Sequence, residues 1–114
     1  LIHLKPGVSE YYTIIGLLYE MKADTIASKR YFTEAIIRYD QKLNTMKIHD
    51  RKYDLLLFNK AFNLVLIRQN EKGNQIMKAL YDKNNDETFR EMIRIYMNKS
   101  KQEILDMLVN EGRF

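Results

Sequence analysis

The sequence predicts an all-α domain of about six helices, arranged as stacked antiparallel hairpins. Apolar residues recur at spacings of three and four along most of the chain, which is the period of a helix with a buried face. Only one proline and four glycines occur in the 114 residues, too few turn residues for a many-stranded sheet. Apolar residues make up 46% and charged residues 30% of the chain, a balance typical of a globular domain with one core.

The chain divides into a short lead-in and one domain. Residues 1–8 are mostly apolar and include Pro6 and Gly7, which interrupt a helix. We expect this segment to be an N-terminal extension or the end of a preceding segment that has been removed. Residues 9–114 are predicted to form a single helical domain, because so few helix-breaking residues interrupt them.

Capping residues delimit the first two helices. Ser9 is a good N-cap for a helix from about residue 10 to 22, and Asp24 is a good N-cap for a helix from 25 to about 46. The turn between them is so short that the two helices are expected to fold back on each other as an antiparallel hairpin.

The first helix carries a wide apolar surface and a glycine in its middle. Its apolar positions cover more than half of the helix, which predicts contacts on two sides. Gly16 costs about 1 kcal/mol relative to alanine at such a position. A neighbouring helix that passes too close for a Cβ atom would offset that cost. Ser28 on the second helix is the small residue predicted to face Gly16.

The third helix is predicted from about residue 51 to 69, after a cap at Asp50. It is apolar nearly all round over three turns. Such a helix is either buried on most sides or exposes an apolar surface to a partner. The sequence leaves these two alternatives open.

Three shorter helices follow. The first runs from a cap at Asn70 to about residue 83, and the second follows a cap at Asp86 and ends near residue 98. The Ser-Lys-Gln-Glu sequence at 100–103 is the pattern of a capping box, which opens the last helix.

Seven residues of the first hairpin share the spacing of a known repeat. An aromatic, a large apolar, a small and an aromatic residue on the first helix precede a small, an aromatic and a small residue on the second. The pattern resembles the tetratricopeptide repeat (TPR) over about residues 9–41, and one or two degenerate copies follow. The resemblance implies a short TPR-like right-handed superhelical solenoid that serves as a protein-binding scaffold. The residues assigned to repeat packing are Tyr12, Ile15, Gly16, Tyr19, Ser28, Phe32 and Ala35.

The resemblance also implies a binding site. In this family the first helices of successive hairpins line a concave groove that takes peptides or helices of partner proteins. Here the groove would be apolar with an acidic edge, and its residues would be Glu10, Thr13, Leu17, Glu20, Met21, Leu55, Phe58, Phe62, Val65 and Leu66. We therefore expect a non-catalytic protein-interaction module. Two alternatives stay open, a homodimer through the 51–69 helix and a last helix that folds in to cover the groove.

The sequence predicts no reaction chemistry. Cysteine is absent, so thiolate metal sites and cysteine nucleophiles are excluded within these residues. His3 and His49 lie far apart in sequence without neighbouring ligands, and no glycine-rich phosphate-binding loop occurs. Helix capping and solubility explain the paired carboxylates. We expect no catalytic residue, no metal and no cofactor.

Charge and hydropathy limit the partners and the compartment. The net charge is +4, with Lys and Arg scattered among Asp and Glu, which is typical of solvated helix faces. A nucleic-acid-binding surface is therefore the less favoured alternative. No apolar run reaches the ~18 residues of a membrane-spanning helix. We expect a cytoplasmic protein or, if a signal segment preceded Leu1, a periplasmic or cell-envelope one.

Overall fold

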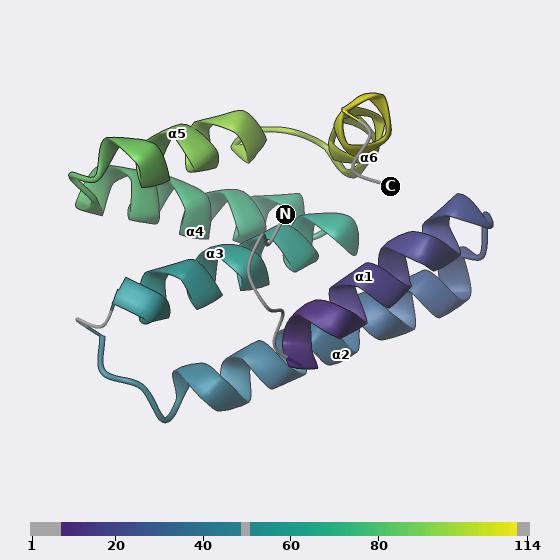
Figure 1. The fold of residues 1–114 in the computed structure, drawn as a ribbon, viewed down its shortest axis with the longest axis horizontal. Coiled ribbons are helices and arrows are strands. Elements are labelled where there is room, and N and C mark those ends of the chain that lie inside the picture. Colours follow the sequence, from purple (N-terminus) through teal and green to yellow (C-terminus); the bar gives the residue numbers. More distant parts are fainter. Residues whose placement is uncertain (1–7, 49–50, 112–114) are drawn as a thin grey trace.

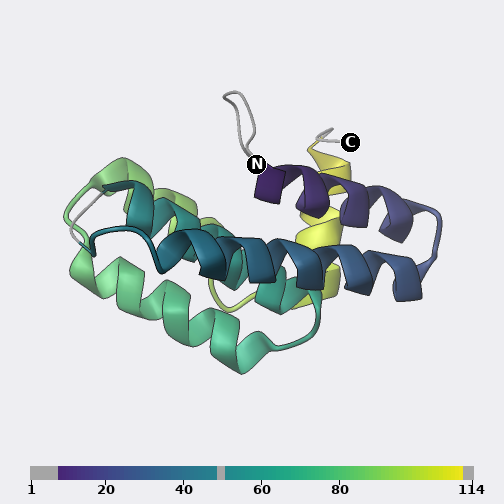
Figure 2. The ribbon, with the colours of Figure 1, turned by 90° about the horizontal axis from the view of Figure 1, so that it is seen from below.

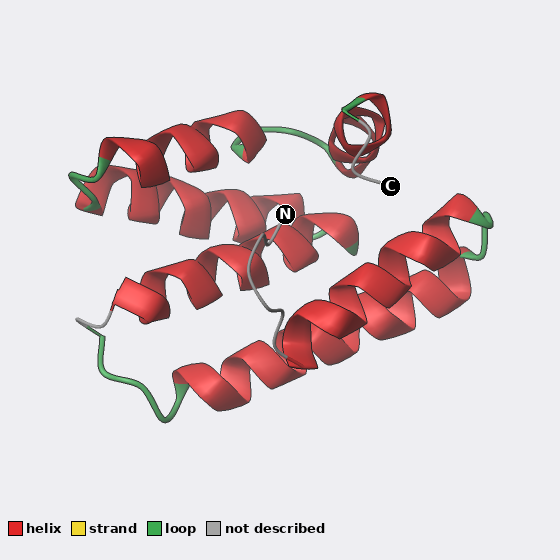
Figure 3. Ribbon diagram, viewed as in Figure 1, coloured by secondary structure: helices red, strands yellow, loops and turns green. Residues whose placement is uncertain are grey.

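The computed structural model describes residues 8–48 and 51–111, and these residues form six helices. In chain order the helices are α1 (Val8–Met21), α2 (Thr25–Leu43), α3 (Arg51–Leu66), α4 (Asn70–Lys83), α5 (Glu87–Tyr96) and α6 (Lys101–Asn110). No strand occurs in these two ranges (Figure 3). The predicted all-α fold is therefore confirmed. The ends of α2, α3 and α5 come two or three residues earlier than the sequence predicted.

The helices form two antiparallel hairpins, then a helix that lies along the second hairpin, and last a helix that crosses the others (Figure 1). α1 packs on α2, α3 packs on α4, and contacts between α2 and α3 join the two hairpins. α5 returns along α4. α6 is viewed end-on in Figure 1, and Figure 2 shows it crossing behind α1. The last two helices therefore do not form the third antiparallel hairpin that the sequence predicted.

α3 lies at the centre of the core. Every residue from Ala61 to Leu66 is buried, so the helix is covered on all sides over its last turns. The apolar pattern all round this helix therefore reflects burial within the chain. The other helices contribute to the same cluster Leu17, Phe32, Met77, Leu80, Ile93, Tyr96, Ile104 and Leu108.

Three of the predicted caps are present. The Asp24 carboxylate accepts a hydrogen bond from the Ala27 N–H at 3.0 Å, and Asp86 caps α5 in the same way. Ser100 and Glu103 form the predicted capping box at the start of α6. Because these motifs act over three or four residues, their positions can be predicted from sequence alone.

Two other caps differ from the prediction. Ser9 lies inside α1 and is buried, so it does not cap that helix. Asn70 is the first residue of α4, and the N-cap position belongs to Gln69, whose side chain makes no capping hydrogen bond. The predicted cap at Asp50 lies outside the described residues, as does the lead-in at residues 1–7.

Gly16 allows α1 and α2 to approach closely, as predicted, but its neighbour is a different residue. A Cβ atom added at Gly16 would lie 2.5 Å from the ring of Phe32. The Ser28 hydroxyl instead donates its one proton to the Glu20 carboxylate at 2.5 Å, and the Thr25 carbonyl is the longer alternative acceptor at 3.1 Å. The close approach of α1 and α2 is therefore a contact between the backbone of Gly16 and the ring of Phe32.

Gly73 has the same role in the second hairpin. A Cβ atom added there would lie 2.7 Å from Cγ2 of Val65 and 2.8 Å from the carbonyl oxygen of Ala61. The start of α4 thus passes directly against the backbone of α3. Substituting this glycine requires a movement of main-chain atoms.

The turn between α3 and α4 contains a residue in the left-handed region. The Gln69 N–H donates to the Leu64 carbonyl at 2.8 Å and the Arg68 N–H to the Val65 carbonyl at 2.9 Å. This pair of bonds forms a Schellman motif, in which glycine usually occupies the position of Arg68. Arg68 has φ of 67°.

Candidate functional site

The predicted groove residues on α1 fall into buried and exposed groups. Thr13 and Leu17 are buried, and the Thr13 hydroxyl donates to Asn63 Oδ1 of α3 at 3.0 Å. Glu20 pairs with Nζ of Lys101 of α6 at 2.7 Å, and both side chains are 9% exposed. Glu10 is half-buried and Met21 is 59% exposed. Most of the predicted α1 site thus faces other helices of the chain.

The predicted groove residues on α3 are also covered by the chain itself. Phe58, Phe62, Val65 and Leu66 are each at most 1% exposed, whereas Leu55 is 39% exposed. The aromatic rings of α5 lie over the two phenylalanines, with Tyr96 packing edge-on against Phe62 at 5.3 Å between centroids. Ile104 and Leu108 of α6 belong to the same cluster as Leu17.

The described residues therefore leave no open groove between α1 and α3. α5 and α6 occupy the space in which the sequence predicted a partner, and covering by the last helix was one of the alternatives. The physical reason is that α3 has α2 and α4 as its neighbours on one side and the C-terminal helices on the other, so both of its apolar sides meet the chain's own residues. Among the described residues of α3, Leu55 is the only large apolar side chain that is exposed. Among the described residues, α3 therefore presents little apolar surface to a second copy of the chain.

The residues assigned to repeat packing lie between α1 and α2. Phe32 and Ala35 are fully buried, and the Ser28 side chain is buried as well. Tyr12 and Tyr19 stack on the ring of Tyr31, at centroid distances of 6.3 and 5.4 Å. Ile15 and Gly16 lie on the same helix and are half-buried and buried respectively.

A buried polar cluster joins α1, α2 and α3, and the sequence analysis did not predict it. It consists of Thr13, Tyr39, Asn59 and Asn63, all at most 2% exposed. Asn63 accepts from Thr13 and donates to the Asn59 carbonyl at 2.8 Å. Burial raises the pKa of the Tyr39 hydroxyl, and the negative charge of Glu10 adds to the shift. The two asparagines, four residues apart in an apolar helix, were the available signal.

The cluster gives a prediction about stability. Thr13 and Asn59 lie close enough to Tyr39 to oppose the rise in its pKa, but neither Tyr39 Oη nor Asn59 Nδ2 makes a hydrogen bond of regular geometry among the described residues. Tyr39→Phe should therefore leave the free energy of unfolding unchanged or raise it by up to about 1 kcal/mol, whereas Thr13→Val should lower it by about 1–3 kcal/mol because Asn63 loses its donor. Urea denaturation followed by circular dichroism measures both. An equal loss in the two variants would show that the Tyr39 hydroxyl is satisfied, for instance by a buried water.

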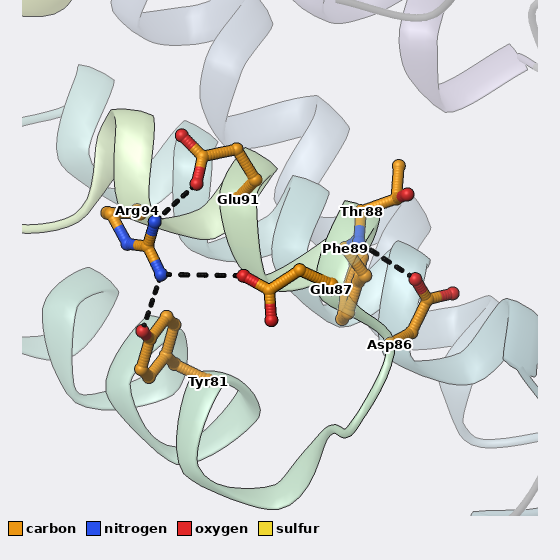
Figure 4. A network of polar contacts seen from close by, with 7 residues as sticks. All are labelled: Tyr81, Asp86, Glu87, Thr88, Phe89, Glu91 and Arg94. Atoms are coloured by element: carbon orange, nitrogen blue, oxygen red, sulfur yellow. Dashed lines mark hydrogen bonds and ion pairs between the residues drawn. The ribbon is translucent and has the colours of Figure 1, made fainter.

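An exposed polar network joins α4 to α5 (Figure 4). Arg94 donates to the Tyr81 hydroxyl at 2.9 Å and pairs with Glu87 at 3.7 Å and with Glu91. The hydrogen bond that Arg94 donates to Tyr81, followed by the negative charge of Glu91, raises the pKa of the Arg94 guanidinium. The charged groups are exposed and pair with one another, so the network is best explained as a surface contact that joins the two helices.

A strip of exposed apolar side chains lies on α1. We call it the α1 stripe, and it consists of Tyr11, Ile14, Leu18 and Met21, which are 40–59% exposed. Their spacing of three, four and three places them along one face of the helix. α2 and α3 contact the other faces, through Phe32 at Gly16 and Asn63 at Thr13. The sequence predicted contacts on two sides of this helix, and α2 and α3 supply them. The face that carries the α1 stripe is a further side, and it has no cover among the described residues.

Neither a metal cluster nor a membrane span is found in the ranges that the structure describes. They contain no group of three or more His, Asp or Glu side chains that could hold a metal ion. The two histidines considered in the sequence analysis, His3 and His49, lie outside these ranges. No described helix has the length and apolar composition needed to cross a bilayer.

Comparison of the chain with protein-family models, with curated proteins and with solved structures found no match. The resemblance of the first hairpin to the TPR family therefore stays a prediction.

Proposed function

We propose that this chain is a non-catalytic protein-interaction domain that binds an amphipathic helix of a partner protein along α1. The observation that carries the proposal is the α1 stripe. Contiguous apolar patches on the surface of a small domain commonly mark interaction sites. Side chains spaced by three and four form the ridges and grooves against which a second helix packs. The likeness of the first hairpin to the TPR, whose first helices carry the ligand, also supports this function.

The proposal differs in one respect from the groove that the sequence predicted. Of the predicted α1 residues, only Met21 belongs to the α1 stripe, since Thr13 and Leu17 are buried against the chain's own helices. The partner helix would therefore lie on the outer side of α1, away from α3. Replacing the apolar side chains there removes binding surface without opening the core.

A selected helical peptide tests the proposal. Amphipathic helical peptides are selected against the domain from a display library, and their affinities are then measured for Leu18→Glu. The expected loss is about tenfold or more, because a buried leucine contributes about 1.5–3 kcal/mol. Ile37→Glu on α2 is the matched control, since Ile37 is 45% exposed and lies outside the stripe. Peptides that bind Leu18→Glu as tightly as the unmodified domain would contradict the proposal.

Self-association along the same surface is the second candidate function. The spacing of the α1 stripe is symmetrical about Gly16, because Tyr11 and Met21 lie five residues away and Ile14 and Leu18 two. A second α1 running antiparallel would therefore meet an equivalent row of side chains, as a two-fold axis requires. Sedimentation velocity at increasing concentration separates the two candidates. A dimer that Leu18→Glu dissociates supports self-association, and a monomer at all concentrations rejects it.

A further inference from the structure

A second surface of the chain lies between α2 and the turn from α3 to α4. It is a groove with a volume of about 680 Å³, bounded by the first half of α2 on one side and by residues 66–68 on the other. We call it the basic groove. Its residues used below are Ile26, Lys29, Arg30, Ile67 and Arg68.

Three positive charges of the basic groove have no carboxylate partner in the part of the chain that the structure describes. Lys29, Arg30 and Arg68 are exposed, and none pairs with a carboxylate among the described residues. The two other charged side chains that line the groove are already neutralised. Lys101 pairs with Glu20 at 2.7 Å and Glu34 with Arg38 at 3.1 Å. The groove therefore presents three free cations to a ligand.

The groove also contains an apolar surface. Ile26 is 81% exposed, which is the largest exposure among the described large apolar side chains. Ile67 is half-buried on the opposite wall. A ligand that matches this site carries several negative charges and an apolar group between them.

We propose that the basic groove binds an acidic peptide segment of a partner protein. Carboxylates of the peptide pair with Lys29, Arg30 and Arg68, while one of its apolar side chains packs on Ile26 and Ile67. Arginine suits this role because its planar guanidinium can hold a carboxylate by two parallel hydrogen bonds.

The lining of the groove favours a peptide over a nucleic acid. Single-stranded nucleic acids are held by aromatic side chains on which bases stack, in addition to cationic side chains. No aromatic residue lines the basic groove. The exposed isoleucine is better matched to an aliphatic side chain than to a base or a phosphate.

The basic groove and the α1 stripe share no residue, so the two sites are tested independently. A selected helix that fails to bind α1 would leave the proposal for the groove unaffected. Conversely, loss of acidic-peptide binding would say nothing against the α1 site.

The probe for the test is a short labelled peptide with glutamates on both sides of one leucine. Its binding is followed by fluorescence anisotropy at low and at physiological salt. We expect Lys29→Glu combined with Arg30→Glu to weaken binding at least tenfold. The affinity of the unmodified domain should fall as salt rises, because exposed ion pairs are screened.

The control variant makes the same change in net charge elsewhere. Lys42→Glu combined with Lys47→Glu alters two exposed lysines outside the groove. If both double variants lose the same peptide affinity, the loss depends on net charge alone, and the proposal is overturned. Failure of the peptide to bind the unmodified domain would also overturn it.

Arg68→Gly separates binding from folding. Glycine is the residue that the left-handed backbone at this position favours, so the variant is expected to melt at the same or a higher temperature. The same variant should bind the peptide more weakly, because it removes one of the three cations. Unchanged peptide affinity in Arg68→Gly would contradict the assigned role.

A single-stranded oligonucleotide of matched charge completes the test. If it binds more tightly than the peptide, and if Lys29→Glu with Arg30→Glu abolishes that binding, the groove is a nucleic-acid site and the peptide proposal is wrong. Tighter binding of the peptide, lost in the same variant, supports the proposal.

Discussion

Lys101→Met is expected to destabilise the protein by about 3 kcal/mol, because it leaves the Glu20 carboxylate buried without its counter-charge. The two groups join the second half of α1 to the first turn of α6, with 2.7 Å between their atoms. Ser28 still donates a hydrogen bond to Glu20 in the variant, but one neutral donor does not replace a positive charge. Urea denaturation measures the loss.

Two further variants make this prediction specific. Lys78→Met removes one partner of an exposed ion pair with Asp82, and its effect should stay within about 0.5 kcal/mol. Combining Glu20→Leu with Lys101→Met should recover part of the stability, because no buried charge remains unpaired. If Lys101→Met and Lys78→Met have equal effects, solvent reaches the Glu20 pair and the contact is a surface one.

Gly73→Ala should destabilise the protein by about 2 kcal/mol, although alanine is the better helix former. The added methyl group would lie 2.8 Å from the carbonyl oxygen of Ala61 and 2.7 Å from Val65. Overpacking of this kind costs about 1–3 kcal/mol, and the obstacle is main-chain and fixed by the hydrogen bonds of α3. Thermal denaturation followed by circular dichroism measures the effect.

The control for Gly73→Ala is the reverse change on the exposed face of the same helix. Ala79→Gly should cost about 1 kcal/mol through helix propensity alone, since Ala79 is exposed. If Gly73→Ala instead raises the free energy of unfolding by about 1 kcal/mol, helix propensity alone decides its stability. That result would mean that α3 and α4 are further apart than described.

Local features of the fold could be predicted from the sequence. Asp24, Asp86 and the Ser100–Glu103 box mark helix starts because a cap acts on the N–H groups of the next turn. The close approach at Gly16 could be predicted for a similar reason, since a glycine in a helix needs a compensating contact. Its neighbour Phe32 could not, because Ser28 lies one turn earlier on the same helix and has the smaller side chain.

Less of the candidate site than of the fold could be predicted from the sequence. Phe58 and Phe62 have the same apolar character whether they face a partner or the chain's own α5, and helical periodicity does not distinguish the two. After the turn that follows Tyr96, α6 crosses α1 (Figure 2), whereas the sequence predicted that α5 and α6 would form a third hairpin. Likewise, Lys29 and Arg68 are distant in sequence and form one groove only because α2 packs against α3.

The contact between the first and last helices has a consequence for synthesis on the ribosome. Translation delivers α1 before α6, so Glu20 lacks Lys101, and the apolar cluster that contains Leu17 lacks Ile104 and Leu108, until α6 has emerged. A repeat array with contacts only between neighbours can fold progressively from its first unit. This chain completes its core only after α6 arrives, so its nascent form presents an apolar surface to chaperones throughout elongation.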